Sequence, residues 1–189
     1  DASATVEAAL HSMASCGSTR ARQLLTEAFQ NRVHEAWQNL LALHVLPEEG
    51  DLSLQFLRAA LDDSATRCRQ LAFRILEMLE DTSVLRSVEK VLRIESARSR
   101  ADALEILSNL GEREAASLLV LMLEEGPLED RISTVTSTIP LPAGPDVILE
   151  QARASGDRWL RMAAAGAGTG TGESDVREEK MERLLILRR

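Results

Sequence analysis

The apolar residues of this chain recur with the spacing of an α-helix. One run comprises Leu71, Ala72, Ile75, Leu76 and Leu79, and the next comprises Val84, Leu85, Val88, Val91 and Leu92. Recurrence at every third or fourth residue places the members of each run on one helix face. Residues 115–123 are apolar nearly all round, as expected for a helix buried between neighbouring helices. The pattern predicts an all-α fold.

A longer stripe crosses residues 20–45 and comprises Leu24, Leu25, Ala28, Phe29, Val33, Ala36, Trp37, Leu40, Leu41 and His44. It predicts one long helix, with a shorter helix before it near residues 4–13. We expect residues 1–50 to form an N-terminal helical cap on whatever follows. A single Trp on such a stripe is typical of a core position, so we predict that Trp37 is buried.

Helix boundaries after residue 50 are suggested by polar side chains that can accept hydrogen bonds from free backbone N–H groups. The expected N-caps are Asp51, Ser64, Asp81 and Ser96. Glycine and proline punctuate the chain at Gly111, Gly126-Pro127 and Gly144-Pro145. Together they predict helical hairpins over residues 51–80, 81–110, 112–139 and 143–170. Residues 134–139 are rich in β-branched side chains, but the repeat spacing places them in a helix.

An internal repeat accompanies these hairpins. Residues 61–76 and 92–107 share a leucine, two arginines, an alanine and an Ile-Leu pair at a shift of 31 positions. Within this register Arg69, Arg100, Arg131 and Arg161 follow one another at intervals of 31, 31 and 30. A period near 30 with one hairpin in each unit is typical of stacked helical repeats. We therefore predict about four repeats over residues 51–172, wound into a right-handed α-solenoid.

The four arginines predict a structural ladder. In a stack of repeats, each guanidinium can donate charge-assisted hydrogen bonds to a carboxylate or to backbone carbonyls of the neighbouring repeat. In the alternative interpretation, the arginines face outward and bind an acidic partner. Full exposure of Arg69, Arg100 and Arg131 without carboxylate neighbours would exclude the structural role.

Two segments resemble a known family. Residues 157–165, Asp-Arg-Trp-Leu-Arg-Met-Ala-Ala-Ala, are similar to the second helix of HEAT and HEAT-like repeats. Residues 100–107, Arg-Ala-Asp-Ala-Leu-Glu-Ile-Leu, resemble the HEAT segment of large bacterial proteins related to ATP/ADP translocases, with Asp102 in place of the usual Asn. The resemblance implies a segment that follows a transporter-like membrane part and precedes a cyclic-nucleotide-binding domain. It carries no functional residue of either flanking part onto this chain.

Composition and charge narrow the function classes. The net charge of −8 argues against nucleic-acid binding, which needs clustered Lys and Arg. Cys16 and Cys68 form no disulfide framework and no ligand-spaced pair, so we expect a reducing, cytoplasmic location. Apolar runs of about six residues do not span a bilayer. We expect no insertion of this segment into a membrane, although other parts of a parent protein can attach it to one.

Both ends of the sequence suggest a piece of a larger protein. The chain begins at Asp1 and ends in an apolar run flanked by charged residues. We expect residues 173–189 to form a linker helix towards a following domain. The alternative is a whole protein from which a tag has been cleaved.

Three sequence features raise the question of catalysis or ligand binding. His34-Glu35 resembles the pairs of iron-binding HEAT hydroxylases, but a metal site needs three or four convergent ligands and the chain has three histidines in all. Residues 166–172 are glycine-rich like a phosphate loop, but the Lys-Ser/Thr ending is missing, so a linker is expected. Arg67 and Arg69 flank Cys68 and are candidates to activate its thiol, whereas a small residue on a helix explains the cysteine equally well.

We therefore expect a non-catalytic helical-repeat module for protein–protein or interdomain interaction, without cofactor or metal. Trp159 is the candidate interaction residue, because Trp is enriched at binding hot spots. A second hypothesis is a regulatory relay between a membrane part and a cyclic-nucleotide-binding domain. A third is a HEAT-type lyase or hydroxylase.

Overall fold

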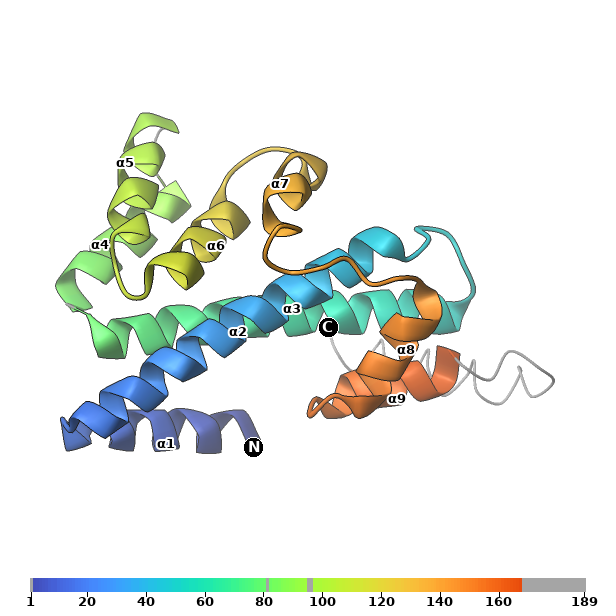
Figure 1. The fold of residues 1–189 in the computed structure, drawn as a ribbon, viewed down its shortest axis with the longest axis horizontal. Coiled ribbons are helices and arrows are strands. Elements are labelled where there is room, and N and C mark those ends of the chain that lie inside the picture. The colour runs from blue at the N-terminus through green and yellow to red at the C-terminus, as the bar shows by residue number, and fades with distance from the viewer. Residues whose placement is uncertain (1, 81, 95–96, 168–189) are drawn as a thin grey trace. The chain divides into compact units, whose positions relative to one another are not determined.

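A computed structural model describes residues 2–80, 82–94 and 97–167 (Figure 1). Within these ranges every element of regular secondary structure is a helix, which confirms the predicted all-α class. The helices are α1 Ala2–Cys16, α2 Thr19–Val45, α3 Leu52–Leu79, α4 Thr82–Ile94, α5 Ala97–Ser108, α6 Arg113–Leu123, α7 Leu128–Val135, α8 Pro145–Ala154 and α9 Arg158–Ala167. The linker helix expected over residues 173–189 lies outside the described residues.

The chain divides into two compact units, and the divisions fall inside α2 and α3. Of the described residues, the first unit holds those up to residue 35 and those from 67 to 135. The second unit holds residues 36–66 and 136–167. The N-terminal and C-terminal parts of each long helix therefore belong to different cores.

Helix α2 confirms the predicted long helix, and α1 confirms the shorter one before it. Trp37 is fully buried, as predicted, and so are Phe29 and Leu41. Leu24 and His44 are exposed, because they lie at the edges of a stripe whose centre faces the core. Burial of the central stripe is what holds α2 in each unit.

The hairpin predicted over residues 51–80 is wrong, because α3 is one continuous helix. Asp62-Asp63-Ser64 offers side-chain acceptors but contains no glycine or proline, so nothing in the backbone forces a break. Ser64 is not an N-cap. It is almost completely buried in the second unit, and the Nδ2 atom of Asn39 donates a hydrogen bond to its Oγ atom at 3.2 Å. This bond gives each of the two buried polar side chains a partner inside the core while the helix continues.

Helix starts are capped by short acceptors, only one of which was predicted. The Oδ1 atom of Asp51 accepts a hydrogen bond from the backbone N–H of Leu54 at 2.8 Å, which confirms the predicted N-cap of α3. Ser18 caps α2 and Asp157 caps α9 in the same way. Asp81 and Ser96 lie outside the described residues.

Glu112 is an unusual N-cap, at the start of α6. Its carboxylate accepts hydrogen bonds from the backbone N–H groups of Ala115, at 2.9 Å, and Glu114, at 3.3 Å. These bonds, that from Ala115 above all, lower the pKa of Glu112 below its ordinary value of 4.5. The cap is therefore fully present above that pH and is lost as the pH falls through the lowered pKa.

Two helices lie in each of the three later ranges where hairpins were predicted, 81–110, 112–139 and 143–170. Helices α4 and α5 pack on each other, as do α8 and α9, which lie side by side in Figure 1. Helix α5 also packs on α6. Helix α7 ends at Val135, so the prediction that residues 134–139 are helical is wrong beyond that point. Residues 136–138 form a turn between Val135 and Ile139, which are both buried.

One core joins four helices of the second unit. Its buried members come from the C-terminal end of α2 and the loop after it, from the N-terminal half of α3, and from α8 and α9: Ala42, Leu46, Phe56, Leu57, Ala60, Leu61, Ile148, Ala152, Leu160, Ala163 and Ala164. At about 25 cal/mol per Å² of apolar surface removed from water, burial of this kind is the main stabilising contribution to such a unit. It positions α9, whose outer face is described below.

We expect Gly111→Ala to destabilise the first unit more than Gly17→Ala. Both glycines have left-handed backbone, with φ of +66° and +63°, so an added Cβ strains both by about 1–2 kcal/mol. A Cβ at Gly111 would also lie 2.9 Å from the Cδ1 atom of Leu76, whereas one at Gly17 meets nothing within 4 Å. Urea unfolding measures the difference. Equal losses at the two positions would show that the Leu76 contact does not constrain Gly111.

Candidate functional site

Three of the four arginines in the predicted ladder occupy the same helical position. Arg100, Arg131 and Arg161 are the fourth residues of α5, α7 and α9. In each case the guanidinium donates to a main-chain carbonyl at the C-terminal end of another helix. The carbonyls at helix C-termini have no intrahelical donor, and they form the negative end of the helix dipole.

The end of α6 shows the arrangement most completely. The Nη1 atom of Arg131 donates to the carbonyls of Leu121, at 2.9 Å, and Met122, at 3.3 Å. The Nη2 atom of Arg100 donates to the carbonyl of Leu123 at 2.7 Å. The remaining carbonyl of the last turn, that of Val120, accepts the backbone N–H of Glu124.

All four carbonyls of that turn therefore have donors, and arginine side chains supply three of them. Arg100 also forms an ion pair with the carboxylate of the exposed Glu125, which lies 3.5 Å from its Nε atom.

Arg161 repeats the contact in the second unit. Its Nη1 atom donates to the carbonyl of Ser155 at 2.7 Å, directly after the last residue of α8. Arg161 is otherwise exposed, unlike Arg100 and Arg131, which are partly buried. The stacking of these arginines into one ladder stays a prediction.

Arg58 has this chemistry and was missed from the sequence. Its Nη1 atom donates to the carbonyls of Leu43, Leu46 and Pro47 at 2.8–3.1 Å, at the end of α2. It lies in the second turn of α3, outside the 31-residue register. Arg69, which is in that register, lies partly buried in the middle of α3 because that helix does not break at Ser64. Arg58 could have been found by looking for an arginine within two turns of a predicted N-cap. The search for arginines at a fixed interval missed it.

We expect Arg131→Met to lower the free energy of unfolding by about 1.5–3 kcal/mol, because it removes a charged donor from two main-chain carbonyls in partly buried hydrogen bonds. Arg131→Lys should lose less, since the ammonium keeps the charge but lacks the second nitrogen, Nη2, that donates to the carbonyl of Gly126 at 3.4 Å. Arg86→Met is the matched control, because Arg86 is exposed on α4, and its loss should stay within about 0.5 kcal/mol. Urea unfolding measures all three. Equal effects at Arg131 and Arg86 would exclude a capping role.

Cys68 is buried and lies beside Arg32 and Glu35 of α2. Burial, together with the negative charge of Glu35, raises the pKa of its thiol to about 11, although Arg32 opposes the shift. The hypothesis that Arg67 and Arg69 activate this thiol is therefore wrong. Adjacent residues on a helix do not face each other, so their side chains diverge from that of Cys68.

Glu35 of the His34-Glu35 pair, which was considered as a metal ligand, faces an arginine of its own helix. Glu35 forms an ion pair with Arg32 at 2.5 Å, one turn earlier on α2. In the part of the chain that the structure describes, no three Asp, Glu, His or Cys side chains are placed to hold a metal ion. The glycine-rich segment 166–172 begins in the last turn of α9, and its residues from 168 onward lie outside the described part.

We expect Cys68 to resist alkylation by iodoacetamide at pH 8, because a thiol with a pKa of about 11 is almost wholly protonated and buried. Cys16 is exposed and should react first. Between pH 9 and 11 the unfolded thiol loses its proton before the folded one, so stability falls as the pH rises through that range. Comparison with Cys68→Ala isolates this slope. A Cys16→Ser protein that alkylates rapidly at pH 8 would contradict the assignment.

Trp159 and Met162 form an apolar patch on α9. They are 43% and 37% exposed and lie three residues apart, on one helix face. Leu160, Ala163 and Ala164 on the other face are buried in the core of the second unit. The backbone N–H of Trp159 donates to the Oδ1 atom of Asp157 at 2.7 Å, so the patch begins at a capped helix start.

No helix in the described ranges is long and apolar enough to cross a membrane. Comparison of the chain with protein-family models, with curated proteins and with solved structures finds no match.

Proposed function

We propose that this chain is a non-catalytic module of HEAT-like helical repeats that binds another protein or a neighbouring domain. The observation that carries the proposal is the exposed Trp159–Met162 patch on α9. Trp is enriched at binding hot spots, and Met adapts to irregular partner surfaces. An exposed aromatic side chain on a helix anchored by three buried residues offers a rigid contact, which loses little entropy on binding.

The charge around the patch indicates what kind of surface it contacts. Arg158 and Arg161 are exposed on the same helix, and Arg153 is exposed in the last turn of α8. In a chain of net charge −8 this is a local concentration of positive charge. The complementary partner surface has an apolar depression rimmed by Asp or Glu side chains.

The helix pairs support the repeat part of the proposal. Helices α4 and α5, α6 and α7, and α8 and α9 each occupy one expected repeat, and in each pair the second helix carries the capping arginine at its fourth position. Helix α3 departs from this pattern, since it replaces the expected first hairpin. We propose that residues 82–167 stack as HEAT-like units of a right-handed solenoid, with the preceding helices as a cap.

A cytoplasmic location is part of the same proposal. Both cysteines are free thiols, Cys16 exposed and Cys68 buried, as is usual in a reducing compartment.

Trp159→Ala tests the proposal. Proteins from an extract of the source cells are captured on the immobilised chain and quantified by mass spectrometry. We expect a specific partner to bind the unsubstituted chain. Its binding free energy should weaken by about 2 kcal/mol with Trp159→Ala, which is roughly a thirtyfold loss of affinity. Thermal stability should fall by no more than about 1 kcal/mol, because Trp159 is 43% exposed.

Ile106→Ala is the matched control, because Ile106 is a large apolar residue that is 47% exposed on α5. It should retain the partner. Equal retention of every captured protein by Trp159→Ala and Ile106→Ala would contradict the proposed contact surface.

A further inference from the structure

The second unit contains an apolar groove of about 360 Å³. It lies where the loop after α2, the first turns of α3 and α8, and the last residue of α9 come together. Its apolar lining comprises Leu46, Leu54, Leu57, Pro145, Leu149 and Ala167. A groove of this volume accepts several aliphatic side chains.

The walls of the groove are held in place by the surrounding structure. Leu46 and Leu57 are buried members of the core, and Leu54 and Leu149 pack against that core while remaining partly accessible. Leu54 also lies so close to the backbone of Gly50 that a Cβ there would be 2.3 Å from its Cδ2 atom. Asp51 lines the groove as well, but its carboxylate caps α3. The groove therefore presents fixed apolar walls.

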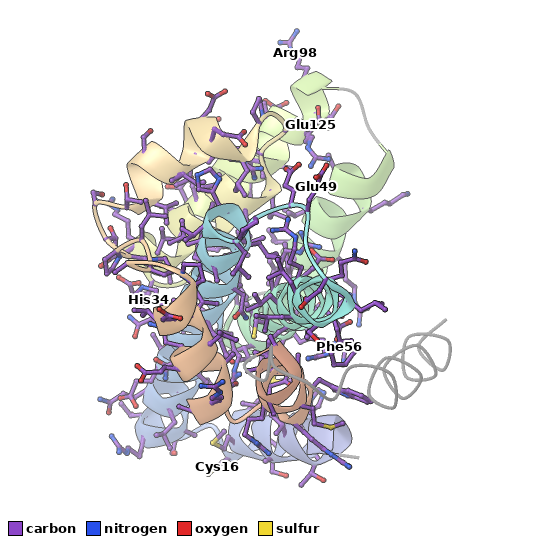
Figure 2. The ribbon with its side chains drawn as sticks, turned by 90° about the vertical axis from the view of Figure 1, so that its right-hand side faces the viewer. Cys16, His34, Glu49, Phe56, Arg98 and Glu125 are labelled. Atoms are coloured by element: carbon purple, nitrogen blue, oxygen red, sulfur yellow. The ribbon has the colours of Figure 1, made fainter. Side chains whose placement is uncertain are left out.

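The rim of the groove is acidic. Glu48 and Glu49 are exposed directly after the lining residue Pro47, and Glu49 is labelled in Figure 2. On α8, Asp146 is exposed and stands one turn before the lining residue Leu149, and Glu150 is exposed one turn after Asp146. An occupant that complements both features has a short aliphatic run flanked by cationic side chains.

The chain itself contains such a sequence, in residues 183–189: Arg-Leu-Leu-Ile-Leu-Arg-Arg. We propose that this segment binds the groove of its own chain, with its four aliphatic residues against the apolar walls and its arginines against the acidic rim. The inference does not rest on the proposed function, since it concerns another surface and no outside partner.

The distance along the chain permits this contact. Ala167 lines the groove, and 16 residues separate it from Leu184, a length that spans up to roughly 50 Å when extended. A tether of this length gives the segment an effective concentration on the order of 1 mM at the groove. Even an intrinsic dissociation constant near 0.1 mM then leaves the groove about nine-tenths occupied. An outside peptide must compete with the segment for the site.

Paramagnetic broadening in the full chain tests the placement. A nitroxide is attached at Met181→Cys in a Cys16→Ser background, which leaves only the buried Cys68. We expect the amide signals of Leu54 and Leu149 to be broadened selectively. The broadening should vanish when residues 184–187 are all replaced by serine, and it should weaken with Glu48→Lys and Glu49→Lys together. The matched control is the double variant Asp102→Lys and Glu105→Lys, which reverses two exposed acidic residues on α5. It should leave the broadening unchanged.

Three results would overturn the proposal: no selective broadening at Leu54 and Leu149, broadening that persists in the four-serine chain, or broadening that arises only between two copies. The last is identified by mixing spin-labelled chain with isotope-labelled chain that carries no nitroxide.

A peptide of residues 181–189 provides a second measurement. It should bind the chain with serine at residues 184–187 about tenfold more tightly than the unsubstituted chain. The reason is that only the unsubstituted chain contains the tethered segment that competes for the groove. Equal affinities, or no binding to either chain, would overturn the proposal. Loss of partner capture by Trp159→Ala is independent of this result, so the two proposals fail separately.

Discussion

The carbonyl groups at helix C-termini must find hydrogen-bond donors, and at the ends of α2, α6 and α8 arginine guanidinium groups supply them. The last turn of α6 is the clearest case, since Arg131 and Arg100 donate to three of its four carbonyls. A buried carbonyl without a donor costs about 1–3 kcal/mol, so the loss of several such bonds would remove a substantial part of the roughly 5–15 kcal/mol that stabilises a typical domain. The guanidinium suits the task because its planar fork reaches two acceptors at once and its charge opposes the helix dipole.

These contacts also specify which helices pair. The capping arginine stands near the start of one helix, and the carbonyls that it reaches stand at the end of another. Formation of the hydrogen bond therefore requires both helices to be in register, which apolar burial alone does not enforce. Arg58 relates the start of α3 to the end of α2, and Arg161 relates α9 to the end of α8. Solenoid repeats need such contacts between neighbours, because each unit packs only on the next.

Much of the helical content was predictable from the periodicity of the sequence. The stripe of α2, the buried Trp37 and the cap at Asp51 follow from local rules that the structure obeys. The buried role of Ser64 could not be predicted, because its hydrogen-bond partner Asn39 is 25 residues away, and reading Ser64 as an N-cap led to a break in α3 that the backbone does not require. The arginine interval was informative about Arg100, Arg131 and Arg161, but it pointed to Arg69 in place of Arg58. The apolar groove could not be found at all, since four separate segments of the second unit build it.

Residue-resolved hydrogen exchange under native conditions tests the capping account most directly. Arg131→Met should accelerate exchange of the amides in the last turn of α6 and the first turn of α7, while α4 keeps its protection. Arg58→Met should have the corresponding effect at the end of α2. An acceleration spread evenly over all helices, or unchanged protection at both helix ends, would contradict the claim that these guanidinium groups hold the helix termini together.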